Sequence, residues 1–453
     1  MKLTFLGATG TVTGSKYLLE DDNKKILIDC GLFQGMKELR QRNWENLPVN
    51  PASINAVILT HAHIDHSGYL PLLVKNGFDG QIYCSSATAD LCDILLPDSA
   101  HLHEEDAERA NRYGYTRHKP ALPLYTQEDS YNALEKIEPV SFGDEHALSD
   151  ILSFRLTHAG HILGASCVHI SDGQTNIVFS GDLGRPRDPV MKVPAQIQEA
   201  DYLILESTYG DRLHETTDPL DQLEDIIIRT SGRGGTVVIP AFAVGRAQSL
   251  MYYIYKLKEM KRIPGIPVYL DSPMAISATK LLQQHHAEHR LSKEECAKVC
   301  NSVIYTQTVE QSKAIYSKNN GMPTVIISAS GMATGGRVLH HLKHYISDPR
   351  NTVLLAGFQA EGTRGARLAH GEVEIKIHGE LLRVRAEIDM LDNISAHADY
   401  QEIIDWLGHF REPPRRTFLT HGEPKAATSF KFKIKEHLDW NVEIPEYEQM
   451  AEL

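Results

Sequence analysis

The stretch LTHAHIDHSG, residues 59–68, constrains this chain more than any other, because it crowds three histidines and an aspartate into six positions. The apolar run Ala56–Leu59 precedes it and predicts a buried strand that delivers these side chains to a tight loop. Histidine and carboxylate are the ligands that zinc and related divalent ions prefer. One ion cannot readily use all four side chains at this spacing, whereas two neighbouring ions can. The alternative is a solvated, histidine-rich turn. The four residues are His61, His63, Asp65 and His66.

The same arrangement recurs later in the chain, where apolar strands end in turns that contain glycine. THAGHILGAS places His158 and His161 at one strand end, VFSGDLGR places Asp182 at the next, and FLTHGEP places His421 after another. Any one of these histidines alone would more simply be a surface or core residue. Their repetition at strand ends, where a rigid scaffold positions functional groups, favours a shared metal site.

Composition limits the class of protein. The chain has 453 residues, of which 42% are hydrophobic and 23% charged, as expected for a globular protein with two domains. No segment has the apolar length of a membrane span, and the N-terminus lacks the pattern of a signal peptide, so a cytoplasmic protein is expected. The six cysteines form no C-x-x-C pair and predict reduced thiols. Cys296 and Cys300 have the spacing of one helix face, and core packing is the expected reason.

The formal net charge of −13 argues against a protein that coats nucleic acid through bulk electrostatics. Any nucleic-acid site must therefore be local. Bound cationic metals would offset part of the negative charge.

The order of predicted elements indicates two domains. Short β segments dominate the first part, interrupted at residues 86–112 by a predicted pair of helices. From about Tyr209 strands alternate with helices, which is typical of a parallel sheet. The expected fold class is α/β, or α+β, in which residues 1–208 and 396–453 form one discontinuous domain and residues 209–395 form an inserted domain.

The motif H-x-H-x-D-H, followed by the Gly-His turn, the Gly-Asp turn and the late histidine, resembles the metallo-β-lactamase superfamily. This resemblance implies an αββα sandwich with two zinc ions. It assigns His61, His63 and His161 to one ion, Asp65, His66 and His421 to the other, and Asp182 to a bridging position. Asp29, in ILIDCG, then resembles a residue that orients the ligand loop.

The inserted stretch resembles the β-CASP domain, a parallel-sheet α/β domain, and the likeness covers nearly the whole chain. Glu206 in LILESTYGD, His397 in NISAHADY and His421 in LTHGE match the acidic, middle-histidine and last-histidine motifs of that family in order. A histidine in the last motif is typical of RNA-directed members. The motif sequences resemble those of the branch of the family that contains the cleavage subunit of mRNA 3′-end processing and its compact prokaryotic relatives. Neither an N-terminal KH-type extension nor a long C-terminal domain of the ribonuclease J kind is expected.

The predicted activity is hydrolysis of RNA phosphodiester bonds, by endonucleolytic or 5′-to-3′ exonucleolytic cutting. The resemblance implies that a hydroxide bridging two zinc ions attacks phosphorus. His397 is the expected general acid, and Glu206 would hold it in the useful tautomer. Asp29 and Asp65 complete the expected catalytic set.

Several turns of the inserted stretch are candidates for binding the RNA backbone. IISASGMATGGRVLHHL predicts a strand, a loop and a helix whose N-terminus could receive a phosphate. Arginine suits bidentate phosphate contact, although an ordinary βα turn explains the pattern equally well. The candidate residues are Ser330, Gly335, Gly336, Arg337, Arg246 and Arg364.

Three other functions stay open at this point: a DNA nuclease, a small-molecule hydrolase such as a thioesterase or lactonase, and an inactive RNA-binding subunit. His421 argues against the first, the inserted domain against the second, and the filled motif positions against the third. The expected partner is RNA in single-stranded or unstructured segments, with no membrane. A homodimer is compatible with the sequence.

Overall fold

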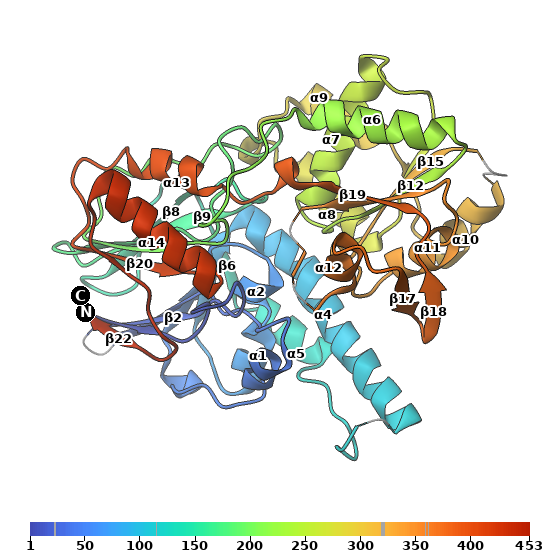
Figure 1. Cartoon of the computed structure of the whole chain (residues 1–453). Helices are drawn as coiled ribbons and strands as arrows, with labels where there is room; N and C mark the ends of the chain where they lie inside the picture. The colour runs from blue at the N-terminus through green and yellow to red at the C-terminus, as the bar shows by residue number, and fades with distance from the viewer. Residues whose placement is uncertain (22–23, 115, 319–321, 358, 361) are drawn as a thin grey trace. The chain divides into compact units, whose positions relative to one another are not determined.

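The computed structural model describes residues 1–21, 24–114, 116–318, 322–357, 359–360 and 362–453. The chain divides into two compact units (Figure 1). The first unit contains Met1–Arg187, Lys192–Leu213 and His397–Leu453, and the second contains Asp188–Met191 and His214–Ala396. The expected boundary at residues 208/209 therefore lies five residues before the observed one. The short segment Asp188–Met191 joins the second unit because the Arg290 amide donates to the Val190 carbonyl at 2.8 Å.

The first unit is built on two mixed sheets of seven strands each. One sheet has the order β22-β1-β2-β3-β4-β5-β6, with β1 (Lys2–Phe5), β2 (Tyr17–Asp21), β3 (Lys24–Ile28), β4 (Ala56–Ile58), β5 (Gln81–Ser85), β6 (Ile137–Val140) and β22 (Met450–Glu452). The other has the order β21-β20-β11-β10-β9-β8-β7, with β7 (His146–Ala147), β8 (Ser153–His158), β9 (Ser166–Ser171), β10 (Asn176–Phe179), β11 (Tyr202–Glu206), β20 (Arg416–Thr420) and β21 (Val442–Glu443).

Apolar side chains from the two sheets form one core between them. Side chains of a strand point alternately to its two faces, so one face of each sheet can be apolar. In β8, Phe154 and Leu156 are buried, whereas Arg155 between them is exposed. Across the core, the ring centroids of Phe5 and Phe418 lie 5.1 Å apart. Residues from the start and the end of the chain therefore share one sandwich interior.

Helices complete the layers of this unit. Helices α3, α4 and α5 pack together, α4 lies against β5 and β6, and α14 lies against β20 and β21 (Figure 1). The predicted αββα sandwich is confirmed. The helical elements are α1 (Lys37–Arg42), η1 (Pro51–Ser53), α2 (Ile64–Ser67), α3 (Leu70–Lys75), α4 (Ser86–Tyr113), α5 (Gln127–Leu134), α13 (Tyr400–Leu407) and α14 (Pro424–Leu438).

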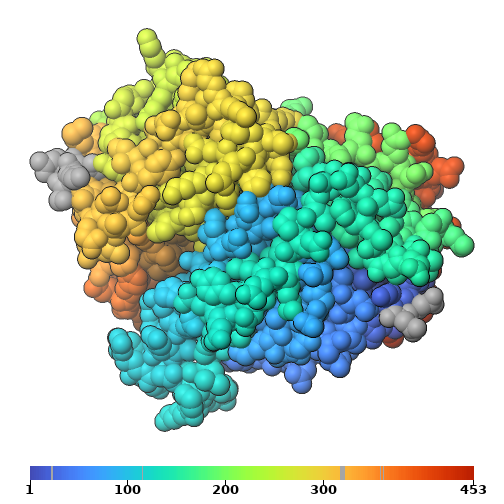
Figure 2. Space-filling view, turned by 180° about the vertical axis from the view of Figure 1, so that it is seen from behind, coloured from blue at the N-terminus to red at the C-terminus, as the bar shows by residue number. Residues whose placement is uncertain are grey.

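Helix α4 corrects one expectation, because the predicted pair of helices is a single helix of 28 residues with Pro97 inside it. Buried alanines continue past the proline, at Ala100, Ala107 and Ala110, so packing holds the helix together where a hydrogen bond is lost. Its C-terminal part stands out from the surface of its unit (Figure 2).

The second unit has a six-stranded parallel sheet in the order β14-β13-β15-β12-β16-β19, as the alternating pattern predicts. Its strands are β12 (Thr236–Pro240), β13 (Val268–Leu270), β14 (Ile304–Tyr305), β15 (Thr324–Ser328), β16 (Thr352–Ala356) and β19 (Glu387–Leu391), with a hairpin of β17 (Glu374–Ile377) and β18 (Glu380–Arg383). Its helices are α6 (Pro219–Gly232), α7 (Arg246–Glu259), α8 (Pro273–Gln284), η2 (His286–Glu288), α9 (Lys293–Asn301), α10 (Val309–Lys318), α11 (Val338–Tyr345), α12 (Arg364–Ala369) and η3 (Asp392–Ile394). Within the described ranges, no helix is long and apolar enough to cross a membrane.

Candidate metal centre

The predicted ligands all lie in the first unit, at the ends of strands or on the short helix α2. His61 follows β4, His161 follows β8, Asp182 follows β10 and His421 follows β20. His63 is the residue before α2, which carries Asp65 and His66. The strands therefore end at one place and bring together side chains that lie up to 360 positions apart in the sequence, such as His61 and His421.

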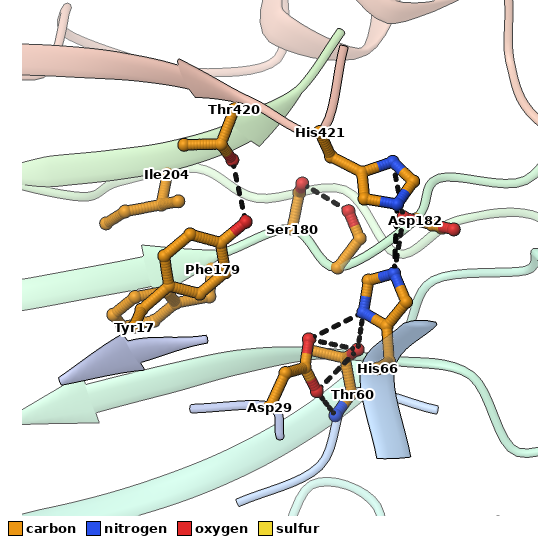
Figure 3. Close-up of a pocket in the computed structure, with 11 residues that line it drawn as sticks. Tyr17, Asp29, Thr60, His66, Phe179, Ser180, Asp182, Ile204, Thr420 and His421 are labelled. Carbon is orange, nitrogen blue, oxygen red and sulfur yellow. Dashed lines mark hydrogen bonds and ion pairs between the residues drawn. The ribbon is translucent and has the colours of Figure 1, made fainter. Parts of the chain in front are cut away.

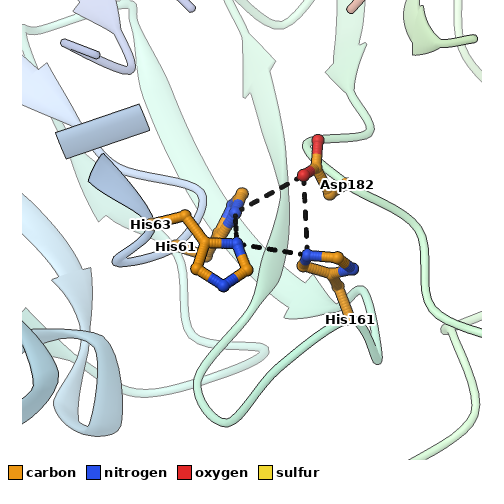
Figure 4. A group of neighbouring side chains, drawn as sticks. All are labelled: His61, His63, His161 and Asp182. Carbon is orange, nitrogen blue, oxygen red and sulfur yellow. Dashed lines mark hydrogen bonds and ion pairs between the residues drawn. The ribbon is translucent and has the colours of Figure 1, made fainter. Parts of the chain in front are cut away.

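One group of ligand atoms consists of three histidines and Asp182 (Figure 4). His63 Nδ1 lies 3.1 Å from His61 Nε2 and 3.3 Å from His161 Nε2. Asp182 Oδ2 lies 3.6 Å from both of those Nε2 atoms. Four potential ligand atoms thus converge on one point.

A second group consists of Asp65, His66 and His421. Figure 3 shows His66 and His421 on either side of Asp182. His421 Nε2 is 3.2 Å from His66 Nε2 and 3.4 Å from Asp65 Oδ2. Asp182 Oδ1 is 3.3 Å from His66 Nε2 and 3.4 Å from His421 Nδ1. The two oxygens of Asp182 therefore face different groups, which is the arrangement that a bridging carboxylate requires.

The protonation of these groups fits divalent cations. Burial lowers the pKa of His61 well below its usual value and that of His63 to about 4, so both rings are neutral and carry a ligand lone pair. Burial opposes charge on His66 as well, but Asp182 and Asp29 raise its pKa well above the usual value. The carboxylates of Asp182 and Asp29 thus stabilise positive charge in the site, and bound metal ions would supply such charge. A set of imidazoles and carboxylates suits zinc-class ions.

Asp29 and Thr60 hold the ligand loop from behind. The Asp29 carboxylate lies 2.7 Å from His66 Nδ1 and accepts hydrogen bonds from the Thr60 amide, at 2.8 Å, and hydroxyl, at 2.9 Å. Because the Thr60 hydroxyl donates to Asp29, its oxygen accepts from His61 Nδ1 at 3.0 Å. This tautomer directs His61 Nε2 to the first group. Sequence reasoning missed Thr60, whose one signal was its place at the strand end directly before His61.

A second pair of residues adjoins the first group. His397 Nδ1 lies 3.2 Å from Glu206 Oε2 and 3.9 Å from Asp182 Oδ2. Glu206 is 1% exposed and also accepts a hydrogen bond from the Leu183 amide, which fixes the carboxylate. Burial would lower the pKa of His397, but the charges of Glu206 and Asp182 raise it to about 8. These charges therefore favour the protonated ring near neutral pH.

A cavity of about 10 Å³ lies beside the second group, lined by Tyr17, Asp29 and His66 among others (Figure 3). This is close to the volume that one water molecule needs. The Tyr17 hydroxyl donates to Thr420, the residue directly before His421, at 2.9 Å. Tyr17 therefore supports the strand end that carries the predicted ligand His421.

The predicted phosphate-binding residues lie in the second unit, and most of their polar groups have internal partners. Arg337 forms an ion pair with buried Asp271 at 2.7 Å and donates to the Thr306 and Gln307 carbonyls. Arg364 donates to the carbonyls of Ala333, Thr334 and Lys376. The amides of Thr334 and Gly335 donate to Ser330 Oγ, Gly336 has a positive φ, and Arg246 is buried at the start of α7. Phosphate contact by these residues stays a prediction.

Three family models match the chain in succession: the metallo-β-lactamase superfamily at residues 9–225, the Beta-Casp domain at 247–368, and the Zn-dependent metallo-hydrolase RNA specificity domain at 381–445. Ribonuclease TTHA0252 of Thermus thermophilus is 36% identical over 431 residues, 93% of each chain. Transcription termination factor FttA of Methanosarcina mazei is 32% identical over 469 residues, 97% of this chain and 69% of that one.

A solved structure supports the fold alone. The crystal structure of a protein of unknown function from Enterococcus faecalis covers 99% of both chains with a TM-score of 0.58 at 13% identity. The two sequence relatives are more similar, at 36% and 32% identity over more than nine-tenths of this chain. The chain therefore belongs to the β-CASP ribonuclease family, a family of metal-dependent hydrolases that act on RNA.

Proposed function

We propose that this chain cleaves RNA phosphodiester bonds with two zinc ions and with His397 as the general acid. The observation that carries this proposal is the placement of Asp182 between two groups of ligands, with the His397–Glu206 pair beside the first. Family membership supports RNA as the substrate, and ribonuclease TTHA0252 is similar over nearly the whole chain.

The first zinc ion would be held by His61, His63 and His161, the second by Asp65, His66 and His421, and Asp182 would contribute to both. When bound, such a pair supplies positive charge at the phosphate and lowers the pKa of water. The protein prepares this site by keeping His61 and His63 neutral and by orienting the His61 ring through Thr60.

His397 would donate a proton to the oxygen that leaves phosphorus. Glu206 faces Nδ1, so the transferred proton is the one on Nε2. Glu206 also favours the charged ring, which keeps His397 protonated near neutral pH. Glu206 is thus a positioning residue, because it acts through His397.

The experiment that tests the function follows product ends and product lengths on RNA and on single-stranded DNA of the same sequence. We expect cleavage of RNA with 5′-phosphate and 3′-hydroxyl ends, because water attacks phosphorus and the 2′-hydroxyl takes no part. Ends with a 2′,3′-cyclic phosphate would refute this chemistry, and equal cleavage of DNA would refute RNA specificity.

The same assay, run on RNA with a 5′-phosphate and with a 5′-hydroxyl, separates the two modes of cutting. Mononucleotides released only from phosphorylated RNA would indicate a 5′-to-3′ exonuclease that binds the terminal phosphate. Internal fragments from both substrates would indicate an endonuclease. The loop at Ser330, Gly335 and Gly336, with Arg246, Arg337 and Arg364, is our proposed contact with the RNA backbone.

Replacing Asp29 with asparagine should weaken metal binding by about 10- to 100-fold, the effect typical of a lost outer partner of a ligating imidazole. The amide keeps the shape of Asp29 but removes the charge that faces His66 Nδ1 at 2.7 Å. Competition with a chromophoric chelator measures the change. Asp144→Asn, at an exposed position, is the matched control. Wild-type affinity in Asp29→Asn would contradict the role of Asp29.

A further inference from the structure

A second cluster of metal-ligand side chains lies in the second unit and contains none of the seven predicted ligands. The ligand atoms of His286, His289 and Cys296 all lie within 4.8 Å of one another. His286 begins the short helix η2, His289 follows it, and Cys296 lies on α9. Three residues from one span of eleven positions thus meet in space.

Local structure explains why they meet. The Ser292 side chain accepts from the Glu295 amide at 3.1 Å and starts α9 there, so Cys296 lies one turn into the helix. Cys300 lies one turn further along the same face and is 1% exposed. The helix therefore presents two buried thiols, of which Cys296 lies beside the histidines.

The two imidazoles have the environment of metal ligands. His289 is 4% exposed and its Nε2 donates to the Leu282 carbonyl at 2.9 Å, so the lone pair is on Nδ1, where it accepts from the Leu291 amide. Such a bond from the far ring nitrogen to a carbonyl is usual for ligating histidines. Within the part of the chain that the structure describes, His286 Nδ1 is buried and has no hydrogen-bond partner. A buried nitrogen of this kind is stabilised when a ligand occupies its lone pair.

We propose that His286, His289 and Cys296 bind a third divalent cation of the zinc class, with the Cys300 thiol as the fourth ligand. Two imidazoles and two thiolates form a common structural zinc site, and sulfur makes this site softer than the His and Asp centre of the first unit. Ligand atoms around tetrahedral zinc lie about 3.3–3.8 Å apart, so His286, His289 and Cys296, whose ligand atoms lie within 4.8 Å of one another, need to close by only about 1 Å. The Leu291 amide, 3.1 Å from His289 Nδ1, holds the ring until the ion replaces it.

The ion would be structural, because four protein ligands complete a tetrahedral site and tie η2 to α9. His286 is only half-buried, which gives an ion a route to the site. The chain near residue 290, yellow to gold in Figure 2, lies on the face of the unit turned to the viewer.

Cobalt titration of the metal-stripped, full-length protein tests the proposal. Thiolate-to-cobalt charge transfer absorbs in the near ultraviolet, and the centre in the first unit has no sulfur ligand among its predicted residues. We expect one equivalent of cobalt to produce this band in the wild-type protein. Cys296→Ser and His286→Ala should each abolish it and lower the zinc content of the purified protein by one equivalent.

Controls keep the result interpretable. Cys84→Ser, at a buried cysteine of β5, should keep the band and all the zinc. His286→Ala changes a half-buried side chain, so it tests the site even where Cys296→Ser fails to fold. Absence of the band in the wild-type protein would overturn the proposal, as would its persistence in both variants or a Cys296–Cys300 disulfide in protein purified without oxidant. RNA cleavage by the folded variants should be unchanged, because the proposed catalytic residues lie in the first unit.

Discussion

Replacing His397 with alanine should lower kcat by about 100- to 10,000-fold, the usual contribution of a positioned general acid. Zinc content should stay at the wild-type level, because His397 is not one of the seven proposed zinc ligands. It lies instead with Glu206 and Asp182. Its Nδ1 faces Glu206 at 3.2 Å, which orients the ring for proton donation instead of metal binding. Single-turnover cleavage of a labelled RNA and metal analysis of the same sample measure both quantities.

The pH profile distinguishes loss of an acid from a general loss of structure. A general acid works only while protonated, so the wild-type rate should fall as pH rises through the pKa of His397, which Glu206 and Asp182 raise to about 8 against the effect of burial. Bound metal ions add positive charge and move this limb to lower pH. His397→Ala should lack the limb. His118→Ala, at an exposed histidine, should behave as wild type. Full activity in His397→Ala would refute the assignment.

Glu206→Gln is the matched test of the pair. Glutamine keeps the size of the side chain and can still accept from the Leu183 amide, as Glu206 Oε1 does at 2.6 Å. It removes the charge that favours protonated His397, so the alkaline limb should shift to lower pH. A merely structural role for Glu206 would change the rate at every pH and leave the limb in place.

The convergence of most of the proposed ligands could be predicted because they follow apolar strands, and strand ends meet at a sheet edge. His61, His161, Asp182 and His421 all follow this rule. Thr60 was missed because a single threonine before a histidine carries no periodic signal. Its role depends on a bond to Asp29, 31 positions earlier, that only the fold creates.

The sequence predicts poorly which partner a charged side chain binds when several partners are within its reach. The sequence around Arg337 suggests an exposed charge at a helix start, but the guanidinium pairs with Asp271, 66 positions away. Asp271 is fully buried and also binds His341 at 2.6 Å, so it requires nearby positive charge. The two helices expected at residues 86–112 are one helix, which the sequence alone did not indicate. The helix continues beyond Pro97 because Ala100 is buried by tertiary packing.

The backbone also shows which positions the centre constrains. Asp29 and His421 have φ values of 57° and 48°, in the left-handed region that residues other than glycine rarely adopt. Each is held there by its neighbours: the Asp29 amide donates to the Ile58 carbonyl at 2.9 Å, and the His421 amide donates to the Ala8 carbonyl at 2.7 Å. Strained residues of this kind cluster at functional sites, which agrees with their predicted roles.

Asp182→Asn should have the largest effect on metal binding, because this one carboxylate faces both groups of ligands. Its two oxygens lie 3.3–3.6 Å from ring nitrogens of His61, His66 and His161. Asparagine preserves the shape but removes the buried negative charge and replaces one oxygen with an NH₂ group that cannot bind a cation. We expect metal affinity to fall by more than the roughly 100-fold seen for lost outer partners, and RNA cleavage to fall below detection.

Loss of metal binding in Asp182→Asn must be distinguished from unfolding of the variant. Burial favours the neutral form of Asp182, but His421 and His66 hold its pKa well below the usual value, so the metal-free wild-type protein keeps a buried charge pair that the variant lacks. Loss of this pair lowers stability, so circular dichroism must first show that the metal-free variant is folded. The folded variant should gain little thermal stability from added zinc, whereas the wild type and Asp144→Asn should gain stability as ligand linkage requires. An Asp182→Asn protein that binds two ions with wild-type affinity would show that Asp182 is not the bridge, and the two groups would then act as separate sites.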